Sequence, residues 1–138
     1  MNTETLKSKP LIIRNDDRPF NGSLRTFDLP TLIEKMKREN TWDKGGLNAK
    51  ILMNKPNKQI VLTVLHKGTE INSFQSNDSI TIQVIEGELK FHTQNESITL
   101  EKGQMLTLQE NIDYSLTTKA ETVLLFTIIK QILQPATI

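Results

Sequence analysis

Apolar and polar residues alternate along most of the chain after Gly46. Ile80, Ile82 and Val84, for example, alternate with polar residues. A period of two is typical of β-strands that bury one face. The pattern predicts strands over residues 49–53, 59–66, 80–84, 89–92, 97–100, 105–108, 112–116 and 121–130. Short strands spaced by roughly 8–12 residues indicate a sandwich or a closed barrel, so we expect an all-β fold.

Turn-forming residues separate these strands. Residues 55–58, Lys-Pro-Asn-Lys, are a strong turn signal between the first two strands. Glu86-Gly87 predicts a tight hairpin turn, because glycine takes a positive φ without strain. Gln94-Asn95 and residues 101–103 predict two further turns.

One segment before the strands has a helical period instead. The apolar residues that share its face are Leu29, Leu32, Ile33 and Met36. Asp28 or Thr31 can cap the N-terminus, and Pro30 suits the first turn. Thr31 with Glu34 fits a capping box. We therefore expect one helix over residues 28–40 and no helix after the glycine pair that follows it.

The 138 residues fit one domain of ordinary size. We expect an N-terminal arm over residues 1–25, a helix and connection over residues 26–46 that pack on the barrel, and the barrel itself over residues 47–138. Within the arm, the apolar run 11–13 can form an edge strand or dock on the sheet. Trp42, the single tryptophan, is expected to pack the helix onto the barrel.

The composition argues against several kinds of site and partner. The chain has no Cys, which excludes disulfides, thiolate zinc sites and a cysteine nucleophile. Its 17 Lys and Arg against 16 Asp and Glu leave no electrostatic footprint for nucleic acid or an acidic membrane surface. No apolar run approaches the ~20 residues of a membrane span, and the first residues lack the apolar core of a signal peptide. We therefore expect a cytoplasmic protein that binds neither nucleic acid nor membrane.

Three glycines carry a resemblance to a known family. Gly68 and Gly87 are separated as in the first motif of cupins, which reads Gly, five residues, His-x-His, three residues, Glu, six residues, Gly. Residues 84–89, Val-Ile-Glu-Gly-Glu-Leu, resemble the common close of that motif. Gly103 and residues 106–112 resemble the start of the second motif. The resemblance covers about half the chain and implies a cupin-like double-stranded β-helix, or jelly-roll barrel, preceded by one α-helix.

The metal ligands of that family are missing. Counted from the first glycine of the motif, Phe74 and Ser76 stand at the two His positions, and Ile80 stands at the Glu position. Tyr114 stands at the His position of the second motif. A cupin metal site needs imidazoles and a carboxylate that converge on one point. We therefore expect no metal and no cofactor, and the family's metal-dependent activities are not carried over to this chain.

The chain has two histidines, His66 and His92. Each follows an apolar residue that is expected to face the barrel interior, so both histidines are expected to face outward. A role as general acid or base would need a carboxylate within hydrogen-bond reach, and Glu70 and Glu88 are the conceivable partners. We favour a surface or interface position for both histidines.

Tyr114 is the one candidate for catalysis. The resemblance implies this role, because some metal-free sugar epimerases of the same superfamily use a Tyr as an acid, together with a His base that is paired with an Asp. No His is expected inside this barrel. The interpretation we prefer is that Tyr114 packs on Phe74 and Ile80 and plugs the barrel.

Three functions are compatible with the sequence. The first, which we favour, is a protein that binds a small neutral or weakly polar molecule in the barrel mouth. Its expected lining residues are Phe74, Ser76, Ile80, Ile82, Tyr114 and Leu116. The second is a metal-free enzyme of the isomerase or epimerase type that uses Tyr114, and the third is a structural or regulatory homodimer with a filled barrel. Binding is favoured over catalysis because the motif positions hold no base with a pKa near 7.

Residues 123–129, Val-Leu-Leu-Phe-Thr-Ile-Ile, favour an oligomer. The run is apolar on both strand faces, whereas a strand with one buried face should alternate. One face can fill the barrel, and the other must be covered by the helix, by the N-terminal arm or by a second subunit. We expect a homodimer.

Overall fold

The computed structural model describes residues 11–15, 23–39, 47–72 and 77–130. These residues contain one helix, α1 (Leu29–Lys37), and ten strands. The strands are β1 (Leu11–Asn15), β2 (Leu47–Lys55), β3 (Lys58–Leu65), β4 (Glu70–Asn72), β5 (Ser79–Glu86), β6 (Glu88–Thr93), β7 (Ser97–Glu101), β8 (Met105–Leu108), β9 (Tyr114–Thr118) and β10 (Thr122–Ile129). No helix follows α1 in these ranges, as the period of two predicts.

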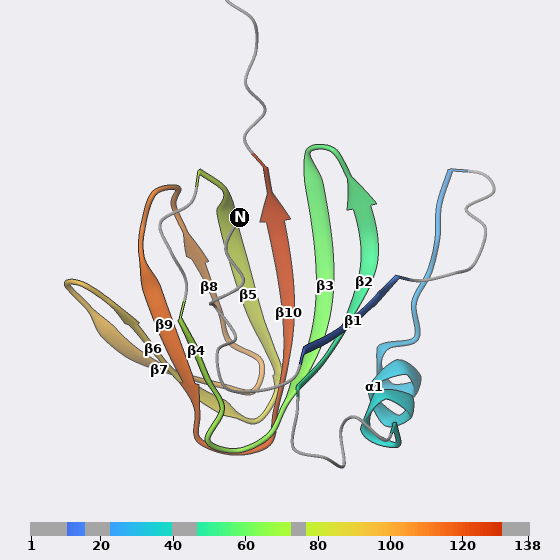
Figure 1. Cartoon of the computed structure of the whole chain (residues 1–138), viewed down its shortest axis with the longest axis horizontal. Coiled ribbons are helices and arrows are strands. Elements are labelled where there is room, and N and C mark those ends of the chain that lie inside the picture. Colours follow the sequence, from blue (N-terminus) through green and yellow to red (C-terminus); the bar gives the residue numbers. More distant parts are fainter. Residues whose placement is uncertain (1–10, 16–22, 40–46, 73–76, 131–138) are drawn as a thin grey trace, which may run out of the picture.

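The strands form two sheets that curve around a common interior (Figure 1). One sheet has the order β1-β2-β3-β10-β5-β8 and the other has the order β4-β9-β6-β7. Neighbouring strands are antiparallel except β1 and β2, which run parallel. Strands that follow each other in the sequence repeatedly change sheets, as in a jelly roll. The expected fold class, an all-β jelly-roll barrel with one helix before it, is confirmed.

Gly87 marks a corner between the sheets and not the expected hairpin. β5 pairs with β10 and β8, while β6 pairs with β7 and β9, so the strands that flank Gly87 do not pair with each other. Residues 101–103 likewise lead from β7 in one sheet to β8 in the other. The hairpin prediction was wrong because a turn signal shows where the chain bends but not which strands pair. Pro56-Asn57 and Gln94-Asn95, by contrast, do join paired strands.

The corner at Gly87 can be formed only by a glycine. Its φ is 91°, in the left-handed region that side chains rarely adopt. A Cβ at this position would lie 2.7 Å from the Cα of Thr122 and would also meet the carbonyl oxygen of Glu121. Gly87 therefore brings the start of β6 into backbone contact with the turn that leads into β10.

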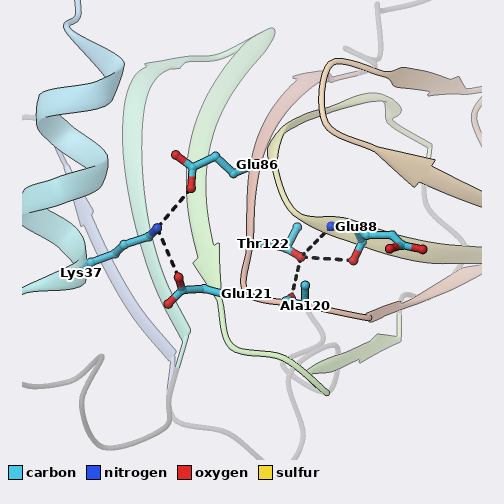
Figure 2. A network of polar contacts seen from close by, with 6 residues as sticks. All are labelled: Lys37, Glu86, Glu88, Ala120, Glu121 and Thr122. Atoms are coloured by element: carbon cyan, nitrogen blue, oxygen red, sulfur yellow. Dashed lines mark hydrogen bonds and ion pairs between the residues drawn. The ribbon is translucent and has the colours of Figure 1, made fainter.

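Threonine hydroxyls bind together the corners at this end of the barrel. Thr122 Oγ1 lies 2.7 Å from the carbonyl oxygen of Ala120 and 3.2 Å from that of Glu88, and it accepts a hydrogen bond from the Glu88 N–H at 3.3 Å (Figure 2). Thr118 Oγ1 lies 2.6 Å from the carbonyl oxygen of His66. Both threonines are buried, so their hydroxyls satisfy backbone groups that the corners leave outside the strand ladders.

The helix begins where the sequence indicated and ends early. Asp28 is its N-cap, with a side chain that accepts from the Thr31 N–H at 3.2 Å. The expected capping box of Thr31 and Glu34 does not form, because Asp28 and not Thr31 is the N-cap. Glu34 pairs with Arg38 at 2.7 Å. The helix ends at Lys37, short of the expected residue 40. Trp42, which was expected to pack the helix on the barrel, lies outside the described residues.

Helix α1 covers part of the outer face of the six-stranded sheet. Ile33 and Met36 are buried against apolar residues of three strands, namely Leu52, Leu62, Val64 and Val123. Asn48 of β2, itself buried, donates to the carbonyl oxygen of Met36 at 3.0 Å and to Glu39 Oε1 at 2.5 Å. Hydrophobic contact and a hydrogen bond to a terminal helix carbonyl therefore hold the helix against the sheet.

Lys37 connects the helix to the corners of the barrel. Its Nζ lies 3.1 Å from Glu86 Oε1 and 3.3 Å from Glu121 Oε1 (Figure 2). Glu86 ends β5 beside Gly87, and Glu121 precedes β10. One cation therefore bridges the two chain segments that the Gly87 corner brings together.

Apolar side chains fill the interior between the sheets. The buried members are Ala49, Leu65, Ile71, Ile82, Val84, Leu89, Phe91, Leu100, Leu116 and Leu124. On β10, Leu124 and Phe126 belong to this interior cluster, whereas Val123 and Leu125 pack on the helix side. Helix α1 thus covers one of the two apolar faces of β10, as one of the expected alternatives had it. The homodimer stays a prediction.

The remaining elements lie at the edges. β1 includes the apolar run 11–13 and forms the edge of the six-stranded sheet, one of the two arrangements expected for it. β4 was not expected, because three residues are too short to show a period. The expected boundaries between the N-terminal arm, the helix with its connection and the barrel, at residues 25 and 46, stay a prediction. In the described ranges, no helix has the length and apolar character needed to cross a membrane.

We expect Gly87→Ala to lower the free energy of unfolding by about 2–4 kcal/mol, because alanine there meets both an unfavourable φ and backbone atoms. Gly68→Ala is the matched control. Gly68 also has a positive φ, 82°, but nothing lies within 4 Å of its added Cβ. The control should lose about 1 kcal/mol. Equal losses for the two variants in urea denaturation would contradict the close approach at the corner.

The Lys37 ion pairs should make stability depend on alkaline pH. Partial burial lowers the pKa of Lys37, but hydrogen bonds and charges from Glu86 and Glu121 outweigh it and raise the pKa above its ordinary value. A group with a raised folded-state pKa stabilises fully below its unfolded-state pKa, about 10.4 for Lys, and loses that contribution as pH rises through the folded-state value.

Lys37→Met should therefore lower the free energy of unfolding by about 0.5–1 kcal/mol at pH 7, and by less above about pH 10.5. Arg38→Met is the control, because its ion pair with Glu34 is exposed and lies within one helix. Urea denaturation at pH 7 and pH 11 measures both variants. If Lys37→Met loses the same free energy of unfolding at both pH values, the charge of Lys37 contributes nothing to stability.

Candidate functional site

Two of the four motif positions lie in the described part of the chain, at the end of the barrel opposite the Gly87 corner. Ile80, near the start of β5, is half-buried against the interior cluster and pairs with Leu108 of β8. Tyr114 begins β9 and is also half-buried. Phe74 and Ser76 lie outside the described residues. We call this end the barrel mouth.

Tyr114 stacks on a core aromatic residue. Its ring centroid lies 5.1 Å from that of Phe91, with an angle of 19° between the ring planes. Phe91 is buried, and Tyr114 packs against the interior cluster as Ile80 does. Stacked aromatic pairs of this kind are stabilising beyond their buried area. Phe74, the expected partner of Tyr114, lies outside the described residues, so the plugging of the barrel by Tyr114 and its use as a catalytic acid both stay hypotheses.

Two other expected lining residues belong to the core. Ile82 and Leu116 have no exposed surface and lie within the interior cluster. They can contribute to a binding site only indirectly, by holding in place the residues that pack on them. Whether the six expected residues form one binding site stays a prediction.

The histidines lie away from the barrel interior. His92 follows Phe91 on β6, and its register partners are Ser97 and Ser115, so it lies on the face opposite the core residues. His66 directly follows β3, and its carbonyl oxygen accepts from Thr118. Both histidines are half-buried. These positions agree with the outward direction that the alternation predicts.

A cleft opens at the barrel mouth beside Tyr114. It has a volume of about 530 Å³ and lies between the β6–β7 turn and the connection from β8 to β9. Its lining residues are Thr93, Gln94, Asn95, Glu96, Thr107, Leu108, Gln109, Asn111, Ile112 and Asp113. Amides, hydroxyls and two carboxylates predominate in this lining, with Leu108 and Ile112 as its apolar members.

A smaller slot continues from the cleft toward the core. It has a volume of about 140 Å³ and lies between β7 and β8, the unpaired edges of the two sheets. Its lining residues are Phe91, Thr93, Glu96, Ile98, Leu106, Thr107 and Leu108. Thr93, Glu96, Thr107 and Leu108 line both spaces. The barrel mouth therefore has a polar compartment and an adjoining, mostly apolar one.

Sequence reasoning missed most of this lining. It assigned Gln94-Asn95 to a turn, and residues 109–113 to a motif and its loop, without expecting the two segments to face each other. One local feature, the φ of 64° at Asn111, is a left-handed conformation that asparagine tolerates better than most residues. The sequence held no signal for the cleft itself, because its two walls come from different sheets.

Comparison with known proteins finds similarity in structure alone. No family model and no curated protein matches the sequence. A cupin superfamily protein from Desulfitobacterium hafniense has 20% identity and a TM-score of 0.63, over 91% of this chain and 98% of that chain. An RmlC-like cupin from Shewanella frigidimarina has 20% identity and a TM-score of 0.57, over 63% of this chain and 78% of that chain. The Clostridium difficile EutQ protein has 14% identity and a TM-score of 0.59, over 75% and 78%.

The chain has the cupin fold. This confirms the resemblance that the glycine motifs carried. Identities of 14–20% establish the fold and transfer no activity, so the function has to be argued from the residues of the mouth.

The residues at the motif positions do not fit the metal that the cupin resemblance implies. Ile80 has no lone pair to donate, and Tyr114 offers only a phenol oxygen, which is a poor metal ligand without a stronger partner. Among the described residues, no group of three or more His, Asp or Glu side chains could hold a metal ion. Transition-metal sites in this fold need several imidazoles and a carboxylate on one point. We therefore derive no chemistry through a metal.

Proposed function

We propose that this protein binds a small molecule at the barrel mouth and does so without a metal. The observation that carries the proposal is the cleft of about 530 Å³ that continues into the slot of about 140 Å³. Small-molecule sites usually have volumes of about 300–1,000 Å³ and combine apolar surface with a few polar groups that fix orientation. The cleft and slot together have this size, and the slot adds apolar surface to a cleft whose lining is mostly polar.

The proposed site adjoins the residues that the sequence singled out. Tyr114 pairs in register with Thr93, which lines both the cleft and the slot. Ile80 pairs with Leu108, which also lines both spaces. We propose Phe74 and Ser76 as further members of the site on the strength of their motif positions. The site thus extends from the motif toward the β6–β7 turn.

The lining favours a ligand without phosphate. None of the residues that line the cleft and the slot is Lys or Arg, the side chains that usually bind phosphate. The side-chain amides of Gln94, Asn95 and Gln109 can donate and accept hydrogen bonds with an uncharged polar group. The proposed cytoplasmic location is compatible with such a ligand.

A structural homodimer with a filled barrel is the second candidate. It is favoured by the dense apolar interior and by the stack of Phe91 on Tyr114. Exposed apolar residues remain on the outside, among them Met105 at 60% exposure and Ile129 at 46%. A second subunit could cover them. In this case the barrel mouth would have no ligand.

We expect Ile98→Trp to weaken ligand binding at least about tenfold, because lost apolar contact is worth about 1–3 kcal/mol and an indole would fill the slot. Ile98 lines the slot and faces the same side of β7 as the core residue Leu100. Thr99→Trp is the matched control, since it places the same side chain on the opposite face of the same strand. A thermal-shift screen of small metabolites, followed by titration of each hit, provides the ligands and the affinities.

Tyr114→Phe tests whether the ligands found in the screen form a hydrogen bond with the hydroxyl of this residue. It keeps the aromatic stack and removes one hydroxyl, so a hit that bonds this hydroxyl should bind more weakly by a factor of about 2–10. If no compound stabilises the wild-type protein, or if hits stabilise Ile98→Trp as strongly as they stabilise Thr99→Trp, binding at the mouth is wrong. The structural homodimer would then be the better account, and light scattering would test its mass.

A further inference from the structure

The two compartments of the barrel mouth differ in chemistry and meet at one carboxylate. The slot is walled by apolar side chains, chiefly Phe91, Ile98 and Leu106, whereas the cleft is lined mostly by polar ones. Glu96, the first residue after the β6–β7 turn, lines both. A ligand that enters the slot must therefore pass beside a negative charge.

Exposed apolar side chains indicate that the ligand itself has an apolar group. Ile98 in the slot is 41% exposed, and Ile112 in the cleft is 39% exposed. Large aliphatic side chains are costly to leave in water, and covering them is favourable by roughly 25 cal/mol per Å². Both side chains face a concave space and not a flat surface, so a small ligand can cover them without a partner protein.

The size of the slot limits this apolar group. Its volume of about 140 Å³ is close to that of an apolar cavity of about 150 Å³ that takes up one benzene molecule. One aromatic ring or a short branched alkyl group would fill the slot. Phe91, whose ring is already stacked on Tyr114, forms the inner wall and limits how far the group can enter.

The charges of the site select the polar end of the ligand. Glu96 and Asp113 are the ionisable residues that line the two spaces, and both are acidic. A carboxylate or phosphate on the ligand would be repelled, whereas an ammonium group could donate charge-assisted hydrogen bonds to these oxygens. The neighbouring amide oxygens of Asn95 and Gln109 can accept further hydrogen bonds from the same group.

We infer, on the basis of the proposed function, that the ligand is a small amine with one apolar group. The apolar group occupies the slot against Phe91 and Ile98. The ammonium group lies beside Glu96, where the slot meets the cleft.

Three probes of the same shape test the charge. Benzylamine, benzyl alcohol and benzoate share one ring and differ in the group next to it. We expect benzylamine to bind with a Kd on the order of a millimolar, as suits so small a molecule. It should bind about 3–10 times more tightly than benzyl alcohol, and benzoate most weakly. Amide chemical shifts followed by NMR at low salt give the affinities, and the shifted amides should lie in residues 91–98 and 106–113.

Two variants test the role of the carboxylate. Glu96→Gln should remove most of the preference for benzylamine over benzyl alcohol and leave the affinity for the alcohol unchanged within about twofold. The turn should survive, because its hydrogen bonds use the backbone N–H and C=O of Glu96 with Thr93. Glu101→Gln is the control, since it removes a carboxylate from the far end of the same strand, outside the lining.

The outcomes separate the two proposals. If the alcohol binds at the mouth as well as the amine does, or if Glu96→Gln leaves the preference intact, the amine inference is wrong and binding at the mouth stands. If benzoate binds most tightly, the positive charge assigned to the ligand is wrong, and binding at the mouth again stands. If none of the probes shifts the amides of the mouth, the amine inference is wrong. If the metabolite screen also yields no ligand, the proposed function is wrong as well.

Discussion

The backbone contact at Gly87 is the constraint on which the rest of the barrel depends. It allows the chain to pass from one sheet to the other while the turn before β10 lies directly against the corner. Thr122 then bonds across this contact, and Lys37 ties the helix to its two sides through Glu86 and Glu121 (Figure 2). One end of the barrel is therefore fixed by a backbone geometry that admits no side chain at that glycine.

The two described motif positions lie at the opposite end of the barrel. In a metal-binding cupin the ligands would have to converge at the mouth, whereas here Ile80 and Tyr114 pack on a filled apolar interior. The stack of Tyr114 on Phe91 closes the core at this level. The cleft and the slot between β7 and β8 lie farther out. The candidate site therefore lies toward the sheet edges, next to the motif positions.

The sequence predicted the features that depend on local pattern, namely the secondary structure and the fold class. The period of two located most strands, Asp28 located the start of the helix, and the glycines indicated the fold. It could not show that Gly87 joins strands of different sheets, because strand pairing is set by contacts far apart in the chain. It missed the cleft for the same reason, since Gln94 and Gln109 come together only when two sheets face each other. Alternation did indicate that Ile82 and Leu116 point inward, but only the packing shows that they are fully covered.

We propose that this cupin fold has no metal centre and that the protein works through the side chains of its mouth. The most direct test is the metal content of protein purified without a metal-affinity tag, measured by elemental analysis after dialysis. We expect far less than one transition-metal ion per chain, because Phe74, Ser76, Ile80 and Tyr114 stand where the ligands would be. A near-stoichiometric iron, nickel, manganese or zinc content that survives dialysis would contradict it.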